Sequence, residues 1–106
     1  MDVLIVNFKL DGISTEAWEQ QAAHLAPKFA AMPDLLSKVW LVDPETNTYG
    51  GAYLWRNRAS LDAYLAGPVF GALNQLPGVH SIQTQTFAAL EAPTRISAGA
   101  VAATGR

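Results

Sequence analysis

The sequence predicts a single α+β domain of the ferredoxin-like type, with the order β-α-β-β-α-β and a four-stranded antiparallel sheet. Two observations carry this prediction. Short runs of β-branched and large apolar residues alternate with segments in which apolar residues recur every three or four positions. The chain of 106 residues suffices for one hydrophobic core, because a domain of this length buries about 64% of its unfolded surface. Right-handed crossovers would place both helices on one face of the sheet.

Four apolar runs, each bounded by turn residues, are the expected strands. They cover Val3–Leu10, Leu35–Val42, Gly50–Arg56 and Val79–Leu90. Residues 43–47 and 76–78 are rich in turn formers and separate these runs from their neighbours. The Gly50-Gly51 pair predicts a β-bulge at the start of the third strand, because glycine inside a strand often marks one.

The first helix is expected to follow a hydroxyl cap at Ser14 or Thr15. Its apolar stripe consists of Trp18, Ala22, Leu25, Phe29 and Met32. Pro27 lies within this stripe, and a proline in a helix interior costs about 3 kcal/mol. We therefore expect a kink or a break near Ala23.

The second helix begins at Asn57 or Ser60, and Gly67-Pro68 interrupts it before a short continuation. The last strand ends the predicted domain at residue 90. Residues 91–106 are rich in Ala, Gly, Ser and Thr and offer little to bury. This segment is therefore expected to be a flexible tail or one that covers a partner subunit.

The first two strands are apolar on both sides, which two helices on one face cannot cover. In the first strand the two sides are formed by Val3, Ile5 and Asn7, and by Leu4, Val6, Phe8 and Leu10. An uncovered face of several hundred Å² would be unusual for a monomer. A second copy related by a two-fold axis is the simplest cover, so the sequence predicts a homodimer.

Composition excludes several classes of protein. The net charge is −2 and no segment concentrates lysine or arginine, which argues against nucleic-acid binding. The chain has no cysteine, so thiolate chemistry and iron–sulfur ligation are excluded. The apolar runs are too short to cross a membrane, and the first residues do not resemble a secretory signal. A cytoplasmic protein without a membrane-bound part is the expectation.

Three kinds of residue are candidates for a site. Asn7 places an amide in an apolar strand, and a buried amide must find hydrogen-bond partners. If Ile5 and Tyr53 face the helices, Asn7 and Trp55 face them too. The sheet and helices would then enclose an apolar pocket with a few polar groups, the usual composition of a small-molecule site. Asn7 held by neighbouring backbone is the alternative.

Aromatic residues gather on elements that would enclose this pocket. They are Trp40, Tyr53 and Trp55 on the middle strands, with Trp18, Phe29, Tyr64 and Phe70 on the helices. Core packing is the alternative explanation. His24 and His80 could act as bases near neutral pH or be ordinary surface histidines, and no third ligand accompanies them at metal-binding spacing. No metal site is therefore expected.

The segment from Lys38 to Leu65 resembles a known family. Lys38-Val39-Trp40, a short acidic turn, the strand from Gly50 to Trp55 and Leu61-x-x-Tyr64-Leu65 resemble the YdhR-type putative mono-oxygenases. These belong to the antibiotic-biosynthesis mono-oxygenase superfamily of dimeric α+β barrels. The resemblance covers roughly residues 1–96, and it implies the same barrel and dimer here.

The resemblance also implies site residues. Asn7 and Trp55 look like the pocket asparagine and tryptophan of the superfamily, while Asn74 occupies the position of its helix histidine. An amide cannot replace imidazole as an axial ligand, so haem binding is in doubt. The catalytic set implied is Asn7, Trp55 and Asn74, and the substrate-binding set is Trp40, Tyr53, Phe29, Tyr64, Phe70 and His80.

The activity that the resemblance implies is mono-oxygenation of a small aromatic or polycyclic phenol by molecular oxygen, without a cofactor. Asn7, Trp55 and Asn74 would stabilise the substrate anion, and His80 or a water molecule would be the base. Two alternatives stay open. The chain could be a non-catalytic dimeric module that binds a small molecule, or an isomerase or cyclase that uses the same pocket without oxygen.

Overall fold

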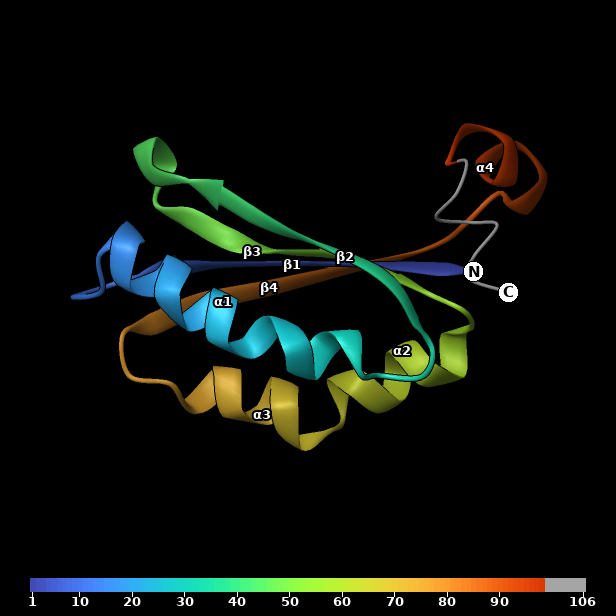
Figure 1. Cartoon of the computed structure of the whole chain (residues 1–106). Helices are drawn as coiled ribbons and strands as arrows, with labels where there is room; N and C mark the ends of the chain where they lie inside the picture. Colours follow the sequence, from blue (N-terminus) through green and yellow to red (C-terminus); the bar gives the residue numbers. More distant parts are fainter. Residues whose placement is uncertain (99–106) are drawn as a thin grey trace.

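The structure, a computed structural model, describes residues 1–98 and confirms the predicted β-α-β-β-α-β arrangement. Its elements are β1 (Asp2–Leu10), α1 (Thr15–Ala30), β2 (Leu35–Asp43), the 3-10 turn η1 (Pro44–Thr46), β3 (Thr48–Trp55), α2 (Arg58–Leu65), α3 (Pro68–Gln75), β4 (Val79–Ala88) and α4 (Glu91–Ser97). As predicted, α1, α2 and α3 lie on one face of the sheet (Figure 1). In residues 1–98, no helix has the length and apolar character needed to cross a bilayer.

The sheet is antiparallel throughout and has the strand order β2-β3-β1-β4. Between β1 and β3, Leu4 lies opposite Tyr53, and Asn7 lies opposite Gly50. Directly opposed residues of antiparallel strands project from the same face of a sheet. This pairing therefore determines which side chains of the two central strands meet the helices.

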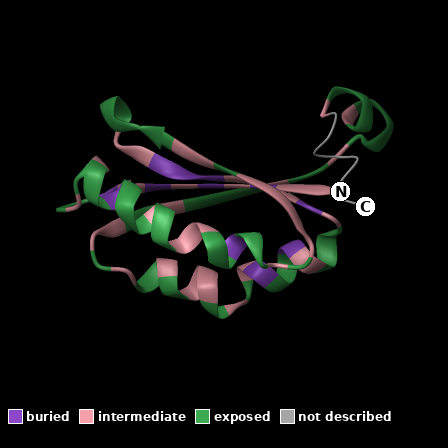
Figure 2. Ribbon diagram, in the orientation of Figure 1, coloured by how far each residue is buried: buried purple, intermediate pink, exposed green. Residues whose placement is uncertain are grey.

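The hydrophobic core lies between the sheet and the three helices. In β1 the buried positions are Leu4, Val6, Phe8 and Leu10, and they alternate with less buried ones. The other buried apolar side chains are Trp18, Phe29, Tyr49, Tyr53, Trp55, Leu61 and Tyr64. Figure 2 shows the buried residues on the inner strands and on the helix surfaces that face them.

The helices follow the sequence signals closely, with one exception. Ser14 Oγ accepts a hydrogen bond from the backbone N–H of Ala17, and Asn57 Oδ1 accepts one from Ser60, so these residues are the caps. The interruption at Gly67-Pro68 separates α2 from α3, as predicted. The break expected near Ala23 does not occur: α1 runs through it without interruption, and Pro27 lies in the last turn of the helix. The carbonyl of Ala23, which loses its partner there, belongs to an exposed residue that water reaches.

The β-bulge predicted at Gly50-Gly51 is wrong. β1 and β3 pair through both glycines without a register shift, and the shifts of the sheet fall at Asn7–Lys9 against β4 and at Leu35–Ser37 against β3. Position 50 requires glycine for a different reason. A Cβ atom at this position would overlap with the backbone carbonyl of Val6, so only glycine lets the two central strands approach so closely.

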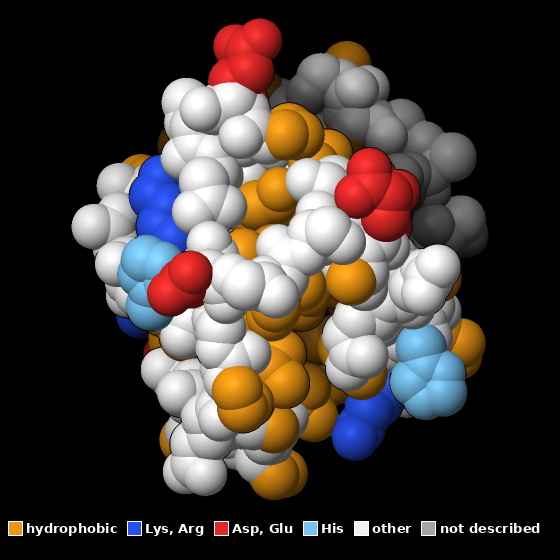
Figure 3. Space-filling view, turned by 90° about the vertical axis from the view of Figure 1, so that its left-hand side faces the viewer, with side chains coloured by type: hydrophobic (Ala, Val, Ile, Leu, Met, Phe, Trp, Pro, Cys, Tyr) orange, Lys and Arg blue, Asp and Glu red, His pale blue; other side chains and the backbone are white. Residues whose placement is uncertain are grey.

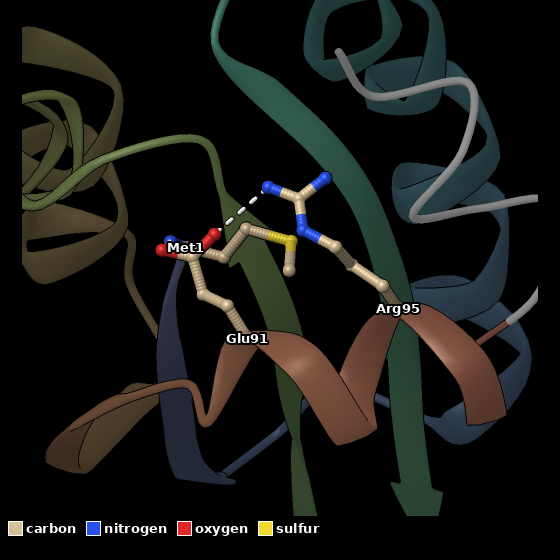
Figure 4. A network of polar contacts seen from close by, with 3 residues as sticks. All are labelled: Met1, Glu91 and Arg95. Carbon is tan, nitrogen blue, oxygen red and sulfur yellow. Dashed lines mark hydrogen bonds and ion pairs between the residues drawn. The ribbon is translucent and has the colours of Figure 1, made fainter.

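The C-terminal part contains a helix that the sequence analysis did not predict. Glu91 Oε1 accepts a hydrogen bond from Arg95 Nη2 at 2.9 Å, and Glu91 Oε2 lies 3.2 Å from the amino group of Met1 (Figure 4). The hydrogen bond from Arg95 and then the Met1 amino group hold the pKa of Glu91 below its usual value. The feature that distinguishes α4 is this set of polar contacts of Glu91 with Arg95 and Met1, and not an apolar stripe. The remainder of the predicted tail, residues 99–106, lies outside the described residues, and its role in covering a partner stays a prediction.

Replacing Gly50 with alanine should lower the free energy of unfolding by about 1–3 kcal/mol, because the new Cβ must displace the backbone of β1. Gly71 in α3 is the matched control, since a Cβ there meets nothing within 4 Å. Gly71→Ala should raise the free energy of unfolding by about 0.5–1 kcal/mol through helix propensity. Urea unfolding of both variants measures the difference, and equal effects would contradict the explanation given for Gly50.

Candidate functional site

A cavity of about 270 Å³ lies between the sheet and the helices, close to the lower end of the usual range of about 300–1,000 Å³ for small-molecule sites. Its walls are mainly apolar and come from β1, β2, β3, α1, α2 and α3. Its polar side chains are Gln21, Lys28, Lys38, Tyr53 and Tyr64. Seen from the end where α1 begins, hydrophobic side chains reach the surface in the middle of the molecule, with polar and charged ones on either side (Figure 3).

Four aromatic residues from four different elements form one side of this cavity. They are Phe29 of α1, Trp40 of β2, Tyr53 of β3 and Tyr64 of α2. The ring of Phe29 meets that of Trp40 edge-on at 5.4 Å between centroids, and lies 6.0–6.1 Å from both tyrosine rings. Such pairs stabilise a fold by about 0.5–1.5 kcal/mol beyond their burial. The walls are therefore both stiff and suited to a flat, apolar molecule.

A lysine lies within this aromatic group. Lys38 Nζ is 3.4 Å from the ring centroids of both Phe29 and Trp40 and 4.6 Å from that of Tyr53. Within residues 1–98, no carboxylate pairs with Lys38. Burial lowers the pKa of Lys38 to about 7, because removal from water disfavours the ammonium form. The ring faces attract the ammonium, so both protonation states are accessible near neutral pH.

The two tyrosines supply hydroxyl groups that stay protonated. Tyr53 Oη and Tyr64 Oη lie 3.1 Å apart and share a hydrogen bond. Burial raises the pKa of Tyr53, and the neighbouring Tyr64 raises it further. Burial also raises the pKa of Tyr64, although its hydrogen bond with Tyr53 opposes the effect. The inner part of the cavity thus combines an amine with two neutral hydroxyls.

Four of the residues predicted to bind substrate line this cavity: Trp40, Tyr53, Phe29 and Tyr64. Phe70 packs behind them, with its ring 5.8 Å from that of Tyr64. Trp55 is buried against Tyr53 and Tyr64 and lines a neighbouring hollow that also contains Asp34 and Ser60. Among the described residues, the indole Nε1 of Trp55 has no hydrogen-bond partner.

The prediction that Asn7 and Trp55 share one pocket is wrong, because Trp55 lines the neighbouring hollow and Asn7 lies on the opposite face of the sheet. It depended on Ile5 and Tyr53 lying on the same side, but Tyr53 is opposite Leu4. Leu4 and its even-numbered neighbours face the helices, so Ile5 and Asn7 face the other side of the sheet. There Asn7 borders a polar groove formed with β4.

Asn74 and His80 are not part of the cavity either. Asn74 is exposed, and its Nδ2 donates a hydrogen bond to the carbonyl of Phe70 within α3. The neighbouring Leu73 faces the sheet, and successive residues of a helix point about 100° apart. His80 is exposed at the start of β4 and pairs with Ser81 Oγ at 3.0 Å. The predicted roles of both residues in the pocket are therefore not supported by their positions.

Lys38 was missed as a candidate, although the sequence contained a signal for it. Lys38 and Trp40 are two positions apart on a strand, so they must share a face. A charged residue that shares a strand face with an aromatic residue, in an otherwise apolar strand, indicates that this face lines a pocket. Among residues 1–98, no three side chains that ligate metals come together.

Comparison with known proteins supplies a family. The model of the family described as "Putative mono-oxygenase ydhR" matches residues 3–100. No curated protein matches the sequence.

Solved structures share the fold. A variant of SnoaB, a cofactor-independent oxygenase from Streptomyces nogalater, is 25% identical, with 85% of this chain and 94% of that chain covered and a TM-score of 0.62. A putative antibiotic biosynthesis monooxygenase from Deinococcus radiodurans is 20% identical, covering 87% and 95%, with a TM-score of 0.65. The heme-degrader MhuD from Mycobacterium tuberculosis, with two hemes bound in its active site, is 18% identical, covering 85% and 96%, with a TM-score of 0.67.

The burial of Lys38 predicts an unusual dependence of stability on pH. Between pH about 7 and about 10 the unfolded chain binds a proton at Lys38 that the folded chain does not, so the free energy of unfolding should rise with pH. Above pH about 10 it should fall, because Tyr53 and Tyr64 keep protons that the unfolded chain loses.

Urea unfolding at several pH values between about 7 and about 10 tests this prediction. Lys38→Met should remove the rise, while Lys28→Met, which replaces an exposed lysine at the rim of the same cavity, should keep it. A flat profile in the unmodified protein would contradict the burial of Lys38.

Proposed function

The chain belongs to the ydhR family of mono-oxygenases, and from this membership we propose that it is a cofactor-independent mono-oxygenase acting on a small aromatic or polycyclic phenol. The substrate would bind in the cavity between the sheet and the helices. The observation that carries the proposal is the aromatic lining of this cavity together with its few polar groups. The likeness to SnoaB, which is described as a cofactor-independent oxygenase, supports the absence of a cofactor.

The cavity suits such a substrate in shape and polarity. Phe29, Trp40, Tyr53 and Tyr64 offer ring faces and edges to a planar molecule. Because the hydroxyls of Tyr53 and Tyr64 share one hydrogen bond, one of the two keeps a free O–H that can donate to the substrate oxygen, on which negative charge develops. In an apolar cavity such donors act with little competition from water.

The reaction balances without an added reductant. The phenol loses its hydroxyl proton, and the resulting anion transfers one electron to dioxygen. A carbon–oxygen bond then forms between the phenoxyl radical and superoxide, and the resulting peroxide anion takes up the proton that the phenol lost to give a hydroperoxide. Loss of water from the hydroperoxide leaves a quinone, so the substrate supplies all four electrons that reduce dioxygen. One oxygen atom enters the product and the other leaves as water.

Oxygen uptake with hydroquinone-like and anthrone-like substrates tests the proposal. Tyr64→Phe removes a donor to the substrate oxygen and should lower kcat/KM by about a hundredfold. Tyr49→Phe is the matched control, because this buried tyrosine bonds to Thr15 outside the cavity, and it should change kcat/KM little.

Two other results would overturn the oxygenase proposal. Thermal stabilisation by the same aromatic compounds without oxygen uptake above the spontaneous rate would indicate a binding module. Conversion at the same rate under nitrogen would indicate an isomerase or cyclase.

We also propose that the chain forms a homodimer through the face of the sheet that α1, α2 and α3 leave open. Val39 of β2 is 59% exposed and Phe87 of β4 is 53% exposed. Pairing with Ala52 and Val3 places both on the open face. Beyond the sheet, Leu90 and Ile96 are also exposed, next to and on α4. A second copy would cover these side chains and complete an α+β barrel.

The cytoplasmic location stays a prediction from the sequence.

Val39→Glu should convert the dimer to a monomer at micromolar concentration, because it would bury an unpaired carboxylate in the interface. Val42→Glu is the matched control. Val42 is 54% exposed on the same strand, but it pairs with Tyr49 and so projects from the helix side. Sedimentation velocity distinguishes the variants. A monomeric unmodified protein, or a dimer insensitive to Val39→Glu, would refute this interface.

A further inference from the structure

We propose that the ε-amine of Lys38 is the general base of this cavity, accepting the hydroxyl proton of an acidic aromatic substrate and then holding the aromatic anion as an ion pair. This inference rests on the proposed function and deepens it. It assigns the base, and it restricts the substrate to planar compounds with an ionisable hydroxyl, such as phenols and enols.

The position of Lys38 is the first argument. Its Nζ lies within the cavity wall, 3.4 Å from the ring centroids of Phe29 and Trp40. A flat ligand that packs against these rings brings its substituents next to the amine. Among residues 1–98, Lys38 Nζ takes part in no hydrogen bond or ion pair, so its lone pair or its protons are available to a ligand.

The charges that face Lys38 are the second argument. Around the cavity, β3 contributes Tyr53, α2 contributes Tyr64 and α1 contributes Lys28, while the lining side chains of β1 and α3 are apolar. None of these groups is a carboxylate. Within residues 1–98, a positive charge on Lys38 therefore has only ring faces to stabilise it until an anion binds. The site is asymmetric in charge and favours an anionic ligand over a cationic one.

The protonation state is the third argument. Burial lowers the pKa of Lys38 to about 7, so a substantial fraction of the amine is neutral near neutral pH and can accept a proton. An ordinary surface lysine, with a pKa of 10.5, would be almost entirely protonated there. An ion pair with the bound anion then raises the affinity of Lys38 for the proton that it has taken.

The proton transfer is balanced. The O–H bond of the substrate breaks, its electron pair stays on the oxygen, and a new N–H bond forms at Lys38 Nζ. The hydroxyl of the Tyr53–Tyr64 pair whose proton is free can then donate a hydrogen bond to the anion. After oxygen has been incorporated, the ammonium returns its proton to the oxygen atom that leaves as water, which restores the neutral amine.

Binding of 4-nitrophenol tests the ion pair independently of catalysis, because its phenolate is yellow and its phenol form is colourless. We expect the bound probe to ionise at a pH at least about one unit below that of the free probe. Lys38→Met, which keeps the length of the side chain, should abolish this shift. Lys9→Met is the matched control, because Lys9 lies outside the cavity and bonds to Thr46 and Thr48, and it should retain the shift.

The pH dependence of oxygen uptake tests the role as a base. The kcat/KM of the unmodified protein should rise with pH through a pKa near 7, as the amine becomes neutral. Lys38→Arg keeps the positive charge but cannot accept a proton. It should retain the colour shift of 4-nitrophenol, lose this rise and lower kcat/KM by at least about a hundredfold.

The outcomes separate this inference from the proposed function. No colour shift in the unmodified protein, or the same shift in Lys38→Met, would overturn the ion pair even if phenols are oxidised. Unchanged kcat/KM in Lys38→Arg would overturn the base. A colour shift that depends on Lys38, without oxygen uptake by any phenol tested, would support the ion pair and refute the oxygenase.

Discussion

The pairing of Leu4 with Tyr53 in the two central strands determines most of this structure. It directs Leu4, Val6 and Phe8 toward the helices, together with Tyr53 and Trp55 of the neighbouring strand. Because side chains alternate along a strand, a shift of one residue would exchange the two faces completely. The core, the cavity and the open face of the sheet all follow from this one register.

The same register explains why a lysine lies among aromatic rings. Lys38 pairs with Tyr53, so it must project toward the helices although it carries a charge. There its amine lies over the rings of Phe29 and Trp40 at the wall of the cavity. The cost of desolvating this charge appears as a lowered pKa. Burial of the Lys38 amine costs stability, but the lowered pKa that results suits the amine to proton transfer. Shifted pKa values of this kind are common at functional sites.

The two faces of the sheet differ in polarity, and only one of them is covered by α1, α2 and α3. The helix side is apolar and closed, whereas the open side combines apolar residues such as Ile5 and Val39 with a polar groove at Asn7 and the glutamines of β4. Such a mixture is typical of an interface between folded subunits, in which apolar contacts and amide hydrogen bonds occur together. The proposed dimer would account for the pattern of the first strand, which is apolar on both sides although its own helices cover only one.

The sequence by itself determined the order of the elements, the caps at Ser14 and Asn57, the interruption at Gly67-Pro68 and the aromatic composition of the site. These depend on local spacing and backbone preference, which neighbouring residues control. Only the tertiary structure decided that Asn7 faces away from the helices and that Lys38 faces them. Alternation along a strand tells which residues share a face, but when both faces are apolar it does not tell which face meets the helices. That choice depends on pairing between strands far apart in the chain, as does the approach of β1 that requires Gly50.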